Sequence, residues 1–210
     1  MPEAISSGSR VNDMKRELIL ASASPRRKEL LEKLDLHFTV CPADVDETRL
    51  PEEDALSYPL RTAVKKALAV AEGKENAVVI AADTVVALDD EILGKPKTEA
   101  EAKEMLRRLA GREHIVITGI GIVDTANHRT LSATEQTIVY FHPLEKEEIE
   151  AYVASGEPMD KAGAYGIQGK GSLLVRKIDG DYFNVMGLPL SKLYRLLLNI
   201  DADILQKTEF

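Results

Sequence analysis

Two adjacent arginines, Arg26 and Arg27, stand where an apolar run over residues 18–21 gives way to an amphipathic stretch, so the sequence predicts a strand-to-helix turn there. Ser24 suits the N-cap of that helix and Pro25 its first position. The free N–H groups of this turn already project positive charge, so each arginine costs about 0.3–1 kcal/mol unless an anion lies between. We therefore expect a phosphate site that includes Ser24 and Arg27. The alternative is that both arginines extend into water or to a nearby carboxylate.

Asp83 is the leading candidate for catalysis. It directly follows a continuous apolar run over residues 77–82, which is typical of a strand covered on both faces. A carboxylate at the carboxyl end of such a strand usually opens into the ligand crevice of an α/β protein. In the alternative interpretation, Asp83 and Thr84 only cap a turn through side-chain hydrogen bonds. A phosphatase with an aspartyl nucleophile is not favoured, because the positions two residues away on either side are alanine and valine.

An acidic segment, Asp44 to Glu47, places three carboxylates in a loop after a short predicted strand. Hard oxygen donors beside a phosphate site favour Mg²⁺ or Mn²⁺, which proteins commonly hold with one or two carboxylates plus substrate oxygens and waters. The alternative is a solvated acidic loop.

Lysines and a glycine-rich segment complete the candidate site. Lys65 or Lys66 on a predicted helix, and Lys95 in a Gly-Lys-Pro turn, are able to contact a triphosphate as point charges, although surface lysines are usually only solvated. Residues 163–171 include four glycines, which let backbone approach a ligand closely. Gln168 within that segment offers a donor and an acceptor to the edge of a nucleotide base. The alternative is an ordinary turn-rich connection.

Composition limits the classes of function. The 210-residue chain has a formal net charge of -8, which argues against a protein that coats nucleic acid. A single cysteine, Cys41, excludes an intramolecular disulfide and a multi-thiolate metal site, and it is consistent with a reducing compartment. No apolar run has the length of a signal peptide or of a membrane span. We expect a soluble cytoplasmic protein whose partners include neither nucleic-acid polymers nor a membrane.

The elements that must position these residues alternate between strand and helix. Strands are predicted over residues 18–21, 37–41, 77–82, 84–88, 91–93, 114–124, 130–141 and 172–178. Helices are predicted over residues 25–34, 52–72, 99–109, 144–154 and 188–200, and Pro59 either kinks the second or marks its true start. The sum is a mixed α/β fold with a partly antiparallel, twisted sheet flanked by helices. We expect an N-terminal extension over 1–16, one domain over 17–200 with two lobes around a cleft, and a tail over 201–210.

Several motifs, taken in chain order, resemble those of the Maf family, which is named for septum formation and comprises nucleoside triphosphate pyrophosphatases. They lie at residues 22–27, 46–47, 82–86, 94–96, 118–119 and 157–169. The resemblance covers nearly the whole chain, from about Glu17 to Leu198, and implies a fold related to the inosine triphosphatases (Ham1), with a deep cleft between two lobes. Met186 departs from the family pattern, where a smaller apolar residue is usual, and the N-terminal extension is longer than typical. Extensions often lie at interfaces, so whether the protein forms a homodimer stays an open question.

The form of residues 160–169 resembles the branch of the family that acts on dTTP and UTP rather than the branch that acts on 7-methyl-GTP. By this resemblance Asp83 is the catalytic base. Substrate selection falls to Arg26, Thr84 and Gln168, and other cleft positions are Glu47, Lys66 and Lys95.

The hypothesis is hydrolysis of dTTP or UTP, or of a modified pyrimidine triphosphate, to the monophosphate and pyrophosphate, which is a nucleotide diphosphatase activity. Arg26, Arg27, Lys66 and Lys95 would neutralise the phosphates. Glu47 and Asp83 would hold the divalent cation. The alternative is a nucleotide-responsive binding protein that regulates septum formation or cell division with little catalysis.

Overall fold

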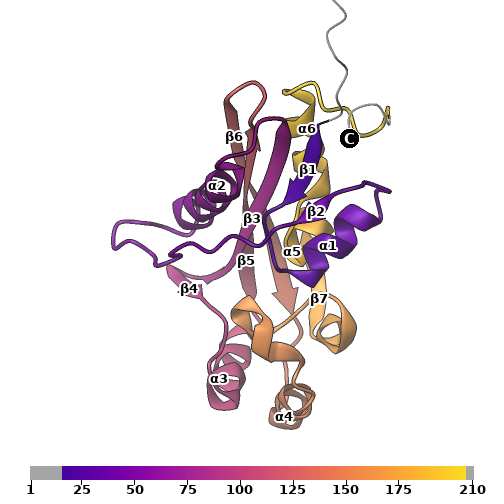
Figure 1. Cartoon of the computed structure of the whole chain (residues 1–210). Helices are drawn as coiled ribbons and strands as arrows, with labels where there is room; N and C mark the ends of the chain where they lie inside the picture. Colours follow the sequence, from indigo (N-terminus) through magenta and orange to yellow (C-terminus); the bar gives the residue numbers. More distant parts are fainter. Residues whose placement is uncertain (1–15, 207–210) are drawn as a thin grey trace, which may run out of the picture.

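A mixed sheet of seven strands forms the centre of the protein, in the order β2-β1-β3-β5-β6-β7 with β4 paired to β3 (Figure 1). The computed structural model describes residues 16–206. Its strands are β1 (Glu17–Leu20), β2 (Thr39–Val40), β3 (Ala77–Leu88), β4 (Glu91–Leu93), β5 (Glu113–Asp124), β6 (Arg129–Phe141) and β7 (Val175–Asp179). β1 is parallel to β2 and β3, whereas β3, β5, β6 and β7 pair antiparallel. The predicted mixed, partly antiparallel sheet is confirmed.

Helices cover both faces of this sheet, as predicted. They are α1 (Pro25–Glu32), α2 (Ser57–Ala71), α3 (Glu99–Leu109), α4 (Lys146–Ala154), α5 (Tyr182–Met186) and α6 (Leu190–Leu198). On one face, two apolar cores lie end to end: one joins β1, α1 and α6, and the other joins β6, α3 and α4. The opposite face packs against α2. The two cores are the centres of the two predicted lobes, which Figure 1 shows above and below the middle of the sheet.

The prediction that a strand ends before Asp83 is wrong. β3 continues without interruption to Leu88, because β5 is equally long and pairs with it residue by residue, placing Asp83 opposite Gly119. The predicted strand over 172–178 also begins later, since Ser172 and Leu173 belong to a short 3-10 helix over Gly169–Leu173. Two further 3-10 helices, Glu157–Asp160 and Ala162–Ala164, and the short helix α5 were not predicted.

Helix α2 begins at Ser57, just before Pro59, so the proline marks the start of the helix and does not kink it. The helix lies directly on β5 at two glycines. A Cβ atom added to Gly119 would stand 2.4 Å from the carbonyl oxygen of Pro59, and one added to Gly121 would stand 2.8 Å from the carbonyl oxygen of Ala63. The two glycines are therefore structural, and they fix α2 close to the middle of the sheet.

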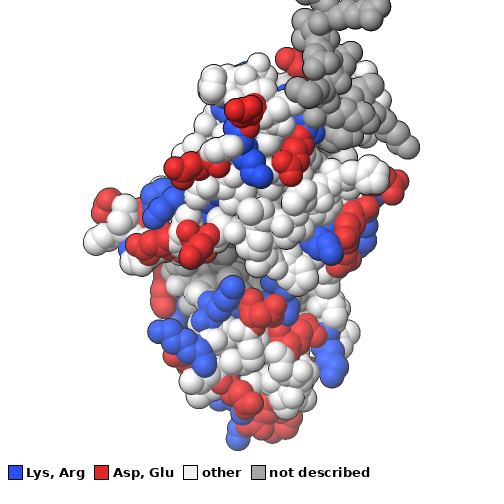
Figure 2. All heavy atoms as spheres, viewed as in Figure 1, with Lys and Arg blue, Asp and Glu red and all other residues white. Residues whose placement is uncertain are grey.

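Charged side chains of both signs gather at the waist between the upper and lower lobes (Figure 2). None of the helices within residues 16–206 is long and apolar enough to cross a membrane. The predicted N-terminal extension, apart from Arg16, and the last four residues of the predicted tail lie outside the described residues.

Candidate functional site

A cleft between the two lobes has a volume of about 1010 Å³ and collects all nine residues to which the sequence assigned a role in catalysis, metal binding, phosphate binding or substrate selection. The nine predicted site residues come from six separate parts of the chain. They are Ser24, Arg26, Arg27, Glu47, Lys66, Asp83, Thr84, Lys95 and Gln168.

The cleft opens where one edge of β3 has no neighbouring strand. On that edge β1 pairs with β3 up to Ile80 and β4 pairs from Val86 onward, so residues 81–85 lie between the two partners. Successive side chains of a strand point to opposite faces. Asp83 therefore faces α2 and Thr84 faces α1, and both line the cleft because the sheet is open between them.

The Asp83 carboxylate forms an ion pair with Lys66 of α2, with 2.9 Å between Oδ1 and Nζ. The same Nζ lies 2.8 Å from Oε2 of Glu47 in the acidic loop. The Asp83 side chain is only 13% exposed, and its burial raises its pKa above the ordinary value, although Lys66 and Arg27 act in the opposite direction. A carboxylate with a raised pKa accepts a proton more readily, which suits a general base.

The two carboxylates of Glu47 and Asp83 fit a divalent cation. Both offer an oxygen to one point, which the ammonium group of Lys66 marks, and one or two carboxylates with substrate oxygens are a usual donor set for Mg²⁺. Of the three carboxylates in the acidic loop, only Glu47 lines the cleft. Asp46 accepts the backbone N–H of Thr48 at 2.9 Å, and between Arg16 and Gln206 no three acidic, histidine or cysteine side chains come together as a metal site.

Arg27 is held by neutral acceptors. Its Nε donates to the carbonyl oxygen of Gly187 at 2.8 Å, its Nη1 to Ser22 Oγ at 3.1 Å and its Nη2 to Thr84 Oγ1 at 3.0 Å. Burial lowers its pKa, although the nearby charge of Asp83 acts in the opposite direction. A guanidinium has five N–H donors, so two of them stay available to a ligand. No carboxylate in the described part of the chain bonds to Arg27, which leaves its charge directed at an anion in the cleft.

A chain of hydroxyl groups fixes how Thr84 takes part. Thr118 Oγ1 lies 3.1 Å from the carbonyl oxygen of Asn184, which can only accept, so Thr118 donates its proton there. The hydroxyl of Thr84, 2.9 Å from Thr118 Oγ1, must then donate to Thr118, and its oxygen accepts from Arg27. The Thr84 hydroxyl therefore has no proton left for a ligand and acts as an acceptor that orients Arg27.

The helix start at α1 differs in one respect from the sequence prediction. Ser24 occupies the N-cap position, but its side chain makes no capping hydrogen bond. The N–H groups of the first turn have no partner within the helix and stay available to an anion, as expected for a phosphate site. Arg26 partly matches the alternative interpretation, in which the arginines extend to a nearby carboxylate. Its Nη1 lies 3.2 Å from Oδ2 of Asp160 in the opposite lobe.

The remaining two predicted residues, Lys95 and Gln168, also line the cleft. Lys95 lies in the loop after β4, and Gln168 precedes the 3-10 helix at Gly169. Lys65 turns away from the cleft, since its Nζ donates to the carbonyl oxygen of Asp46 at 2.8 Å. Of the two lysines on α2, the structure therefore places only Lys66 in the site.

Sequence reasoning assigned no role to three residues that contact the site: Thr118, Asp160 and Asn184. Thr118 had a usable signal, because it is the polar interruption of an otherwise apolar or glycine run in a buried strand and is 0% exposed. Asp160 belongs to the motif over 157–169, but its contact with Arg26 could not be predicted, because Arg26 lies 134 residues away in the chain. Asn184 likewise contacts Thr118 from 66 residues away.

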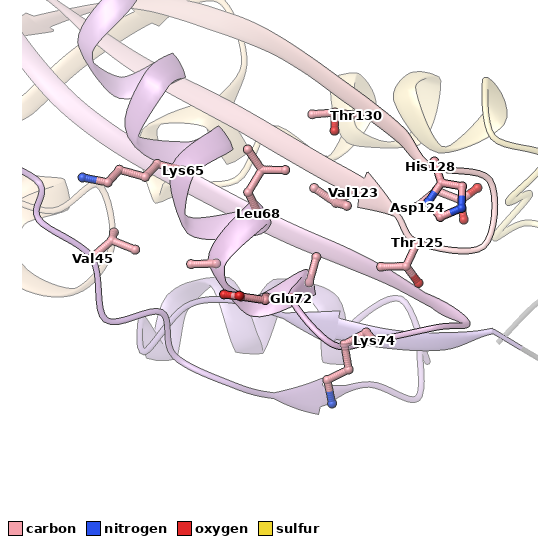
Figure 3. A pocket seen from close by; sticks show the side chains of 12 residues that line it. Val45, Lys65, Leu68, Glu72, Lys74, Val123, Asp124, Thr125, His128 and Thr130 are labelled. Atoms are coloured by element: carbon pink, nitrogen blue, oxygen red, sulfur yellow. The ribbon is translucent and has the colours of Figure 1, made fainter.

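A second hollow of about 690 Å³ lies on the other side of α2 (Figure 3). It is lined by α2, β5, β6 and the turn between these two strands, with Leu68 and Val123 at its centre. None of the nine predicted site residues reaches it, so the chemistry belongs to the cleft.

Fold and cleft together define an α/β protein with cationic side chains beside a buried carboxylate in one cleft. Comparison with known proteins places the chain in one family within that class. The family model described as "Maf-like protein" matches residues 17–200, and the chain belongs to the Maf family.

Curated relatives are similar over most of their length. The chain is 51% identical over 189 residues to a dTTP/UTP pyrophosphatase of Bacillus mycoides (strain KBAB4), covering 90% of this chain and 98% of that protein. It is 49% identical, with the same coverage, to a dTTP/UTP pyrophosphatase of Bacillus cereus (strain AH820). A HAM1 protein from Coxiella burnetii has a similar fold, with a TM-score of 0.51 and 17% identity over 88% of this chain and 99% of that one. The Ham1-like fold expected from the sequence is confirmed.

Proposed function

We propose that this protein hydrolyses dTTP and UTP between the α- and β-phosphates and releases the nucleoside monophosphate and pyrophosphate, as a nucleotide diphosphatase. The observation that carries the proposal is the Asp83–Lys66–Glu47 cluster in one cleft with Arg27, whose guanidinium is bonded only to neutral acceptors. The relatives named dTTP/UTP pyrophosphatase, about half identical over nearly their whole length, support the same substrates.

Phosphate binding rests on Arg27, the first turn of α1 with Ser24, and the lysines of the cleft. The two unused N–H donors of Arg27 and the open N–H groups of the helix bind phosphate oxygens, which replace the water that otherwise solvates them. Lys95 and Lys66 add positive charge to the cleft. The overall charge of the protein is negative, so this local concentration of cations directs a small polyanion into the cleft.

Asp83 orients a water molecule and takes its proton. The water oxygen forms a bond to the α-phosphorus, the bond from that phosphorus to the bridging oxygen breaks, and pyrophosphate leaves with the electron pair. Burial raises the pKa of Asp83, which favours this proton transfer. Glu47 and Asp83 would hold Mg²⁺ or Mn²⁺, and a bound ion neutralises charge on the phosphate oxygens.

Gln168, Arg26 and Thr84 are assigned to substrate selection. Gln168 offers a donor and an acceptor, which match the acceptor carbonyls and the N3–H donor that thymine and uracil share. Arg26 forms an ion pair with Asp160, which lines the cleft as Gln168 does. Thr84 acts indirectly, by orienting Arg27.

The first test is pyrophosphate release by the purified protein with Mg²⁺ or Mn²⁺ and dTTP, UTP, CTP, GTP or 7-methyl-GTP. We expect release from dTTP and UTP above the others. A protein that binds these nucleotides but releases no pyrophosphate would instead support the nucleotide-responsive binding protein. Higher turnover with a modified pyrimidine triphosphate than with either normal one would move the substrate to that class.

A further inference from the structure

The loop that carries Gln168 is fastened by one carboxylate. Oε2 of Glu157 accepts the backbone N–H of Lys170 at 3.0 Å, and Oε1 accepts the N–H of Gly171 at 3.0 Å. Oε1 also accepts the hydroxyl proton of Tyr152 at 3.1 Å. Hydrogen bonds to an ionised carboxylate are about twice as strong as those between neutral groups, so Glu157 is a firm anchor for the segment that directly follows Gln168.

Tyr152 extends the anchor to the segment before Gln168. Its hydroxyl oxygen accepts the N–H of Gly166 at 3.3 Å while its proton goes to Glu157. Tyr152 is 4% exposed and belongs to the core of the lower lobe. The loop over 166–171 is thus held on both sides of Gln168 by two side chains that bond to each other.

Two glycines allow the loop to lie this close to the anchor. Gly169 has a φ of 63°, and a Cβ there would stand 2.9 Å from Oε2 of Glu157. At Gly171 a Cβ would stand 2.7 Å from the hydroxyl oxygen of Tyr152. The backbone is therefore shaped around Glu157 and Tyr152, and the position of Gln168 depends on them.

Glu157 lines the cleft but is poorly suited to contact the substrate. Three protein donors already occupy its oxygens, and a carboxylate would repel phosphates. It also forms no hydrogen bond or ion pair with Asp83, Lys66 or Arg27, which form the part of the site assigned to phosphate chemistry.

We propose that Glu157 is a positioning residue for base selection, which holds the loop so that the amide of Gln168 faces the pyrimidine edge. The proposal rests on the proposed function. Glu157→Gln changes one oxygen to an NH₂ group, which cannot accept, so at least one loop N–H loses its partner. The loop loosens while the phosphate site stays intact, and base recognition weakens without loss of chemistry.

The test compares Glu157→Gln with the unmodified protein in steady-state kinetics with dTTP, UTP, CTP and GTP, and in inhibition by inorganic pyrophosphate. We expect KM for dTTP and UTP to rise about tenfold, the effect of one lost hydrogen bond to a charged group. We expect kcat, the KM for CTP and GTP, and the inhibition by pyrophosphate to change less than about twofold. Glu150→Gln is the matched control, because Glu150 is on α4 and only approaches Lys146 at 3.8 Å.

An equal loss for all four nucleotides, a fall in kcat or weaker inhibition by pyrophosphate would overturn the proposal, since each indicates a general structural role. Unchanged kinetics would also overturn it. Tyr152→Phe is a second variant that removes the bonds to Gly166 and Glu157 but keeps the ring and the charge of Glu157. It should shift the same ratio in the same direction, and it decides the question if Glu157→Gln does not fold.

A failure of the proposed function has a different signature, which is no pyrophosphate release by the unmodified protein from any nucleotide. Calorimetric binding of dTTP and CTP to the unmodified protein and to Glu157→Gln then replaces kinetics. A preference for dTTP that the substitution leaves intact would overturn the role of Glu157, and one that it removes would support it.

Discussion

Acid destabilises this protein through a single buried histidine, His114 of β5. The side chain is 2% exposed, and its Nε2 lies 2.7 Å from the hydroxyl of Tyr165. The rings of Phe141 and Tyr165 pack edge-on at 5.0 and 5.2 Å between centroids. Nδ1 is buried and has no hydrogen-bond partner among residues 16–206. Burial lowers the pKa of His114 to about 4, because an imidazolium there would be desolvated with no acid beside it.

The sign of the effect follows from the lowered pKa. An unfolded histidine binds its proton near pH 6.5, whereas the folded one stays neutral until about pH 4, so unfolding takes up a proton between these values. The free energy of unfolding is therefore highest above pH 6.5 and falls as the pH drops toward 4. At about 1.4 kcal/mol for each tenfold difference in proton affinity, the full loss is about 3 kcal/mol as an upper limit.

Urea unfolding between pH 7.5 and 4 measures this loss, with His114→Gln as the comparison. Glutamine can bond the hydroxyl of Tyr165 but does not titrate, so the carboxylates of the protein contribute equally to both pH profiles. We expect the unmodified protein to lose up to about 3 kcal/mol more than the variant over this range. Parallel profiles for the two proteins would refute the reasoning, even if the variant were less stable at every pH.

Three further substitutions test other contacts. Thr118→Val removes the acceptor for the Thr84 hydroxyl and should weaken inhibition by inorganic pyrophosphate about fivefold, because Thr84 orients Arg27. Thr118→Ser should behave as the unmodified protein, and unchanged inhibition of Thr118→Val would contradict this role. Gly119→Ala should lower the free energy of unfolding by about 1–3 kcal/mol or more, because its Cβ would collide with the backbone of α2. Gly94→Ala is the control, since its Cβ meets nothing within 4 Å. A loss no larger than that of Gly94→Ala would contradict the close packing of α2 on Gly119. Gln168→Ala should reduce the preference for dTTP and UTP over CTP by about tenfold in kcat/KM, and an unchanged preference would remove Gln168 from base recognition.

The sequence pattern predicted the long elements well because their periodicity is local. α3 begins and ends at the residues predicted, and the apolar run before Asp83 identified the central strand. The error at Asp83 has a physical cause: a charged residue in an apolar run resembles the end of a strand, and only the pairing with an equally long β5 shows that the strand continues. α5 was missed because its five residues are too few to show a helical period.

The residues of the site could be named from the sequence, but not their contacts. The ammonium of Lys66 between two carboxylates depends on how α2 rests on β5, and the route from Arg27 through Thr84 and Thr118 joins three separate elements. The anchoring of the Gln168 loop by Glu157 likewise depends on the folded arrangement of two 3-10 helices. Such contacts follow from tertiary packing, which no local pattern encodes.

The most direct test of the central claim is the Asp83→Asn variant, measured for both pyrophosphate release from dTTP and binding of dTTP. Asparagine keeps the size of the side chain but does not accept the proton of the attacking water. We expect kcat to fall about a hundredfold or more while dTTP binding, measured by calorimetry, stays within about threefold. Near-normal turnover by the variant would contradict the assignment of Asp83 as the base. Loss of binding together with turnover would make Asp83 a residue of the binding site rather than of the chemistry.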